Sequence, residues 1–295
     1  MTTTFTAGVA GRYKLIARKE DDSSRDLTDW FENLITDGGL ERMGTGGITE
    51  KCRVGSGNTT PNNTDTALVA QVAEGDIQSY TEGYDSATNL YCWRRIVYRF
   101  ATGVAAGNLS EVGVGWAGGD LFSRALIKDG SGNPTTITVL SDEILDVVYE
   151  LRMYRPTSDL SVNIDIAGVT YACTVRPANF ANWRCTELTQ FGAMGNGNLL
   201  VQGWTTGATL GAITDQPSGT MNMGGVHATN DGAYVTNSKQ RKLKVIASID
   251  DCTSDIKALT FSTALGLYQM LVNPVIPKNS TNKLTLYFTL AWARH

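Results

Sequence analysis

The sequence has few of the residues from which catalytic and metal sites are built. It contains two histidines, the internal His227 and the terminal His295, and five scattered cysteines without a CxxC pair. The cysteines are Cys52, Cys92, Cys173, Cys185 and Cys252. A structural zinc site needs clustered Cys and His ligands, so this spacing argues against one. We interpret the cysteines as reduced, buried thiols.

Charge is also scarce. Charged residues make up 18% of the chain and the net charge is −4, which disfavours the broad basic field that nucleic-acid binding needs. No apolar run approaches the length of a membrane span, and heptads, collagen repeats and β-helix repeats are lacking. The first residues have neither a basic start nor an apolar signal core, so we expect synthesis and folding in a cytoplasm.

What the sequence has instead is glycine, at 31 residues, with abundant Thr, Ser and Asn. Threonine suits strands, while Gly and Asn supply positive φ angles at corners. This composition predicts many short strands joined by turns. The length allows one large domain or two ordinary ones.

Residues 93–154 are predicted to form a meander of antiparallel strands that acts as scaffold. The expected strands are 93–100, 110–116, 121–128, 135–140 and 144–154. The last one alternates strictly, which is typical of a strand with one buried and one wetter face. Its predicted buried face carries Leu145, Val147, Tyr149, Leu151 and Met153, and its wetter face Asp146, Glu150 and Arg152.

Before the meander, residues 11–19 are predicted to form a strand, and a helix is predicted to follow it. The helix is indicated by apolar residues at i, i+3, i+4, i+7 and i+8, with Asp26 as N-cap and Gly38-Gly39 as the stop. These residues are Leu27, Trp30, Phe31, Leu34 and Ile35. Residues 45–66 are expected to form a long surface loop around a short strand at 52–54. A weak apolar segment at 67–73 and a polar loop to residue 89 come next.

After a boundary at residues 155–158, alternation predicts a hairpin of residues 160–166 and 169–175. Residues 177–238 are weakly patterned, and a strand is expected at 243–249. The last strand, residues 283–295, is predicted to be locked into a sheet, either of its own domain or of a neighbouring subunit. One of its faces carries Leu284, Leu286, Phe288, Leu290 and Trp292.

Three local motifs have simple structural interpretations. The GxGxxG pattern of residues 113–118 lacks a following helix, so we expect a glycine-rich corner between antiparallel strands rather than a dinucleotide site. Asp129, Ser131 and Asn133 mimic a calcium loop, but its twelfth position is Leu140, so a turn is expected. The four glycosylation sequons, at Asn58, Asn62, Asn108 and Asn279, are expected by chance in this composition.

No catalytic constellation is evident. Nucleophilic catalysis needs a base beside Ser or Cys, and His227 has no GxSxG elbow to accompany it. Paired carboxylates could hydrolyse a glycan, but the candidates fall at predicted strand ends, where solvated acids are usual. These candidates are Asp142, Glu143, Asp165, Asp250 and Asp251. We therefore expect no enzymatic activity, no catalytic residue, no cofactor and no metal.

Two features favour interaction instead. Trp93, Arg95, Val97 and Arg99 are predicted on one face of their strand, with Arg94, Tyr98 and Phe100 on the other. In an acidic chain these arginines are expected to meet carboxylates, within the protein or across a subunit interface, rather than phosphates. A second feature is a set of aromatic residues in poorly patterned segments, which could form a sugar-stacking surface or be buried. The set comprises Trp183, Phe191, Trp204 and Tyr234.

Several segments together resemble structural proteins of tailed-bacteriophage virions, especially tail-fibre, tail-tip or collar proteins. They are residues 30–42, 54–61, 66–68, 107–115, 121–127, 135–140 and 151–152, with 276–278 and 284–294 in the C-terminal third. The resemblance covers residues 12–156 well and the C-terminal third loosely. It implies a virion building block assembled in several copies. Without fibre repeats, the chain would be a compact adaptor or tip piece.

We therefore predict a mainly β protein of antiparallel β-sandwich-like modules with one short amphipathic helix near the N-terminus. Residues 1–156 would form a helix-braced module for virion attachment, and residues 157–295 a second module ending in the long last strand. The resemblance implies a tail-associated virion subunit that forms a homo-oligomer, with a trimer favoured, and docks to other virion proteins. Alternatives are a tip protein that binds a host-surface carbohydrate or receptor, and a capsid or neck decoration protein. Nucleic-acid binding and membrane insertion are not expected.

Overall fold

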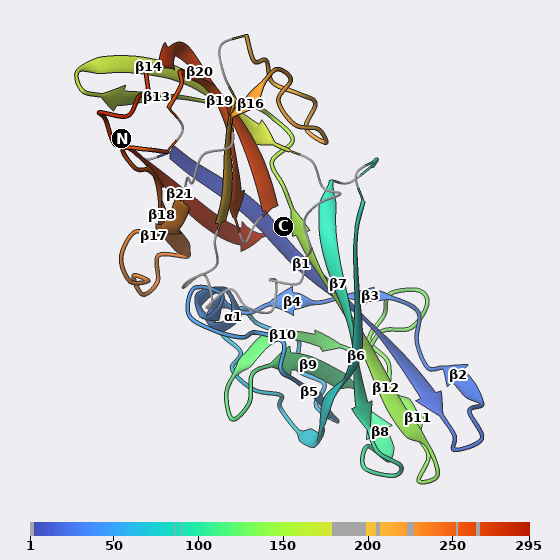
Figure 1. Cartoon of the computed structure of the whole chain (residues 1–295). Helices are drawn as coiled ribbons and strands as arrows, with labels where there is room; N and C mark the ends of the chain where they lie inside the picture. Colours follow the sequence, from blue (N-terminus) through green and yellow to red (C-terminus); the bar gives the residue numbers. More distant parts are fainter. Residues whose placement is uncertain are drawn as a thin grey trace.

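The computed structural model describes residues 3–85, 87–88, 90–178, 199–204, 207–222, 227–251, 253–263 and 266–295. The protein is mainly β, as predicted, and almost all strand pairs are antiparallel. Two groups of strands are joined by the long strand β1 (Thr3–Arg18), which runs through both (Figure 1).

The first group of strands forms a sheet that closes on itself. Around it the order is β1, β12, β7, β6, β5, β9, β10 and β4, and the short strand β3 beside β4 pairs back to β1. The bounds are β2 Ser24–Asp26, β3 Phe31–Glu32, β4 Leu34–Ile35, β5 Lys51–Gly55, β6 Gln71–Asp85, β7 Tyr91–Phe100, β8 Gly107–Leu109, β9 Glu111–Gly115, β10 Leu121–Leu126, β11 Ile137–Val139 and β12 Ile144–Tyr154. Strand β2 flanks β1, and β8 and β11 form a separate pair.

The second group is ordered β13, β14, β20, β19, β15, β17, β18, β21 and finally the first residues of β1, with β16 on β15. The bounds are β13 Leu160–Ile166, β14 Val169–Pro177, β15 Leu199–Trp204, β16 Met221–Asn222, β17 His227–Asn230, β18 Gln240–Ala247, β19 Ile256–Thr263, β20 Gly266–Ile276 and β21 Leu284–Arg294. The division at residue 156 stays a prediction, since β1 pairs with strands on both sides of it.

The sequence pattern located most of these strands because their side chains alternate between core and surface. The five apolar residues of β12 predicted to face the core are all buried, as are the five of β21. The hairpin of β13 and β14 is also confirmed. It turns at Ala167 and Gly168, which both have positive φ angles (49° and 82°), the geometry that two-residue hairpin turns require.

The predicted helix over residues 27–35 is wrong. That segment is extended because it closes the first sheet: Asn33 N donates to Gly11 O of β1, and β4 pairs with β10. Pairing with distant strands outweighs the helical spacing of the apolar residues, which is a weak preference in so short a segment. The helix α1 (Asp37–Arg42) comes later, with Thr36 as N-cap. Gly38 and Gly39, which were expected to end the predicted helix, therefore lie inside α1. Gly39 is needed there because a Cβ would collide with the backbone of Phe122.

The predicted meander and one predicted loop are wrong, and one of two alternatives for the last strand is confirmed. Of the consecutive strands in residues 93–154, β9 and β10 pair, but β7 pairs with β12 and β11 with β8. Residues 74–85, predicted as a polar loop, belong to the long strand β6, which has few buried positions and therefore little visible alternation. The last strand lies in the sheet of its own chain, where β18 pairs with residues 284–291 of β21 and β1 with residues 288–294. Its Trp292 also donates from Nε1 to Leu40 O at 2.7 Å, which ties it to α1.

Candidate interaction surfaces

The face of β12 that the sequence predicts to be wetter is buried instead. Ion pairs with β1 and β7 cover it, and we call this set of pairs the charged ladder. Asp146 and Glu150 are buried, with 1% and 0% exposure. Arg12 and Arg95 lie directly opposite Glu150 on the two neighbouring strands and donate from Nε at 2.9 and 2.7 Å. Since cross-strand partners are the closest neighbours in a sheet, the register itself forms these pairs.

Each carboxylate of the ladder has more than one guanidinium. Arg152 donates to Glu150 at 2.7 Å as a third partner, and Arg18 and Arg99 donate to Asp146 at 2.6 and 2.8 Å. Three arginines at one carboxylate and two at the other make five cations for two anions. The predicted pairing of Arg95 and Arg99 with carboxylates is thus confirmed, and it occurs within the chain.

The surrounding guanidinium groups keep both carboxyls ionised. Burial by itself raises the pKa of Asp146, but hydrogen bonds from Arg99 and Arg18 outweigh it and leave the pKa below its usual value. The pKa of Glu150 is lowered in the same way, against the effect of burial, by its arginine partners. Arg12 lies over the ring of Trp30 at 4.4 Å and Arg95 over that of Trp93 at 4.5 Å, which holds the cations flat on this face.

A second charged pair lies inside the protein. Glu111 and Arg124 are 0% and 1% exposed, and Arg124 donates to Oε2 of Glu111 from both Nε and Nη2. The same carboxylate accepts hydrogen bonds from the backbone amides of Gly57, Val69 and Ala70. A buried pair is stable only when its remaining hydrogen-bonding groups are satisfied, which is the case here.

The same guanidinium reaches the loop between β5 and β6 directly. Arg124 donates to Asp65 Oδ2 at 2.6 Å and to Thr59 O at 2.9 Å. Sequence reasoning missed the pair, although both residues lie in segments that carry the resemblance. The structure brings residues 54–61, 107–115 and 121–127 into contact around it, and residues 66–68 join them through the bond from Leu121 N to Thr66 O.

The strongest candidate docking surface is the outer edge of residues 77–81 of β6, which we call the far half of β6. Strand β5 pairs with residues 71–76 of β6, and of the described strands only β7 pairs with residues 77–81. The β6–β7 hairpin extends past β5 alongside β12, with β6 on the outer side (Figure 1). Ile77 and Tyr80 face the same side of the strand and are 42% and 52% exposed.

The local motifs have structural roles. The glycine-rich residues 113–118 end β9 and turn into the antiparallel strand β10, as expected. The carboxylate of Asp129 accepts from the amides of Ser131 and Asn133, which is a turn. Among the candidate carboxylates, Asp142 pairs with Lys19 and Glu143 with Arg25. Asp165 accepts from Thr170, and Asp251 from the amide of Ser248.

Several of the other candidate residues lie partly or wholly outside the described structure. His227 lies on β17, paired with β15 and β18, but its side chain is outside what the structure describes, as is that of Trp204. Trp183, Phe191, Cys185 and Cys252 lie outside the described residues. Tyr234 packs on Trp292 with ring centroids 6.1 Å apart and donates to Glu41, so it braces α1. The described cysteines, Cys52, Cys92 and Cys173, are buried and form no disulfide.

Within the described part of the chain, no group of His, Cys, Asp and Glu side chains could hold a metal ion. No helix of that part has the length and hydropathy of a membrane span. Comparison with known proteins found no matching family model, no matching curated protein and no matching solved structure.

Proposed function

We propose that this chain is a structural subunit of a tailed-phage virion, associated with the tail, that forms a homo-oligomer and docks to other virion proteins. The observation that carries the proposal is the far half of β6. An outer strand edge with exposed apolar side chains promotes association, and folded proteins normally cover such an edge. A neighbouring copy in an assembly would cover it.

The resemblance to tail-fibre, tail-tip and collar proteins is the reason for choosing a virion among possible assemblies. The four segments of the first group that meet around Glu111 and Arg124 are all segments on which the resemblance is based. These segments pack against one another in the fold. The chain would be made in the host cytoplasm and reside in the tail.

Charge substitutions on β6 test the assembly. Ile77→Lys and Tyr80→Glu each place a charge on the exposed row, and neither side chain is in the core. Glu is chosen at position 80 because the Arg94 guanidinium lies 3.9 Å from the Tyr80 ring centroid, where a carboxylate is compatible with it and a second cation is not. Val235→Lys is the matched control, since Val235 is another exposed apolar residue, at 66%, remote in sequence from β6. We expect light scattering to show dissociation of the two β6 variants and no change for the control. Assembly of both β6 variants at wild-type mass would contradict the role of this edge.

Location is tested separately. Gold-labelled antibodies against the purified chain, applied to virions of the phage that encodes it, should label the tail in electron micrographs. Labelling of the capsid or neck would favour the decoration alternative. If the virions carry no label, and mass spectrometry of the same virions does not detect the chain, the structural role is refuted.

A further inference from the structure

One edge of β1 has no described strand partner where β1 enters the second sheet. Strand β21 pairs with residues 3–9, and β12 pairs with the other edge only from residue 8 onward. His295 N donates to Val9 O on the β21 side. Because backbone groups of successive residues point to opposite edges, Thr4 and Thr6 direct their N–H and C=O groups away from β21.

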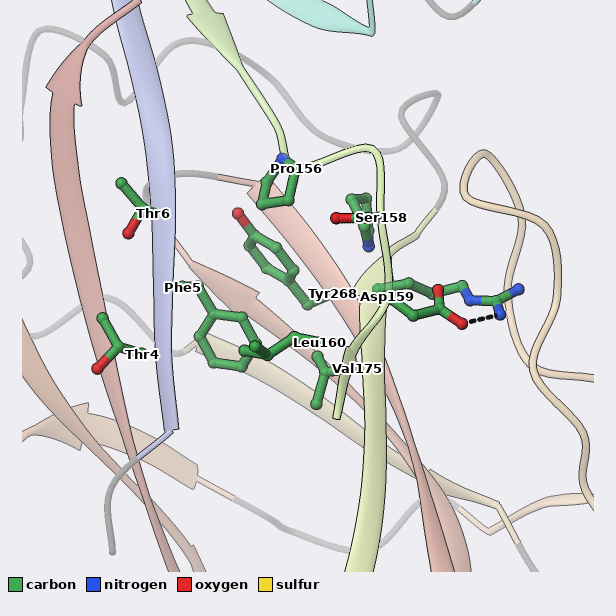
Figure 2. A pocket seen from close by; sticks show the side chains of 11 residues that line it. Thr4, Phe5, Thr6, Pro156, Ser158, Asp159, Leu160, Val175 and Tyr268 are labelled. Atoms are coloured by element: carbon green, nitrogen blue, oxygen red, sulfur yellow. Dashed lines mark hydrogen bonds and ion pairs between the residues drawn. The ribbon is translucent and has the colours of Figure 1, made fainter. Parts of the chain in front are cut away.

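A pocket of about 270 Å³ lies beside this edge. Figure 2 shows Thr4 and Thr6 on β1 at one side, the segment from Pro156 to Leu160 at the other, and the rings of Phe5 and Tyr268 between them. Val175 completes the apolar lining, and the ion pair of Arg176 and Asp159 lies at the rim. The pocket thus continues the gap between β1 and β13, the two ends of the second sheet.

The hydroxyl of Tyr268 points into this gap without a partner. Tyr268 is 1% exposed, and its Oη has no hydrogen-bond partner in the structure. Burial raises the pKa of Tyr268 to about 12, so the group is a neutral donor at physiological pH. A buried hydroxyl without a partner is costly, and proteins satisfy nearly all such groups. An acceptor supplied by a ligand would satisfy this one.

We propose that the gap binds an extended peptide segment of a partner protein, which adds a strand to β1 beside Thr4 and Thr6. One apolar side chain of the peptide fills the pocket, and a peptide carbonyl accepts from Tyr268 Oη. Backbone groups that repeat every second residue along an edge match a peptide, and a pocket for alternate side chains gives selectivity. A stacked sugar fits less well, because both aromatic rings are buried rather than displayed.

The site is separate from the far half of β6, and its occupancy does not depend on what that strand binds. The probe is a displayed library of random seven-residue peptides, selected on the full chain. Binders are then measured with three variants. Thr4→Pro removes the N–H that the peptide would use, while Thr4→Val keeps it and is the control. Tyr268→Phe removes only the hydroxyl.

We expect selected peptides with alternating apolar residues, whose affinity falls about tenfold or more for Thr4→Pro and Tyr268→Phe and is unchanged for Thr4→Val. Without peptide, Tyr268→Phe should melt at a higher temperature than wild type, because a buried unsatisfied group is removed. Failure to select any peptide would overturn the proposal. Peptides that bind all three variants equally would also overturn it, as would a Tyr268→Phe variant that is less stable without peptide.

Discussion

Replacing Arg124 with Met is predicted to destabilise the protein strongly. The substitution keeps an unbranched side chain but leaves the buried carboxylate of Glu111 without its cation. Removing one partner of a buried ion pair costs about 3–5 kcal/mol. Three backbone amides still hydrogen-bond the carboxylate, so we expect the lower end of that range.

The assay is urea unfolding. If a variant shifts the midpoint without changing the dependence of the free energy on urea concentration, the shift reports a change in stability alone. The control is Lys14→Met, because Lys14 forms an ion pair with the exposed Asp26 at 2.7 Å and such surface pairs contribute about 0.2–1 kcal/mol. The double variant Glu111→Gln/Arg124→Met buries no charge, so it should lose less than the sum of the two single losses.

A local measurement separates loss of the pair from general destabilisation. In Glu111→Ala, the amides of Gly57, Val69 and Ala70 lose their acceptor, so their hydrogen exchange should accelerate more than that of β12. If Arg124→Met costs less than about 1 kcal/mol, or no more than Lys14→Met, the reasoning about the buried pair is wrong.

Three further predictions follow from the core and the charged ladder. The lowered pKa of Asp146 stabilises the fold above about pH 4, and this contribution is lost as pH falls through the folded pKa. Asp146→Asn should therefore lower the free energy of unfolding at about pH 7. It should also make that free energy depend less on pH in urea titrations from about pH 2 to pH 7. Gly11→Ala should cost about 1–3 kcal/mol by calorimetry, because a Cβ would collide with the Tyr149 ring. Phe288→Ala should cost about 3–5 kcal/mol in urea unfolding, since Phe288 is buried in the chain's own core.

The strands that could be predicted from the sequence are those with one face in the core. In β13 and β21 every second residue is apolar, and burial largely follows that alternation. In β12 the alternating apolar residues are buried as well, but so is most of the other face. Alternation indicates which residues share a face, but not what covers the polar one. Asp146 and Glu150 are buried because arginines from β1 and β7 lie across them, and those partners are set by a register between strands far apart in sequence.

The errors come from the same cause. Leu27, Phe31 and Ile35 have helical spacing, yet the bond from Asn33 to Gly11 draws that segment into the sheet. Likewise, the importance of Glu111 depends on a loop that reaches it from residues 57 and 69–70. Contacts of this kind are tertiary, so neither local preference nor periodicity indicates them.

The most direct test of the proposed homo-oligomer is the solution mass of the purified chain, measured by light scattering over a range of concentrations. The account predicts a stable assembly, with a trimer favoured, at three times the chain mass of 31.8 kDa. It also predicts that Ile77→Lys reduces this mass to that of one chain. A monomer of 31.8 kDa at every concentration up to the solubility limit would contradict the account.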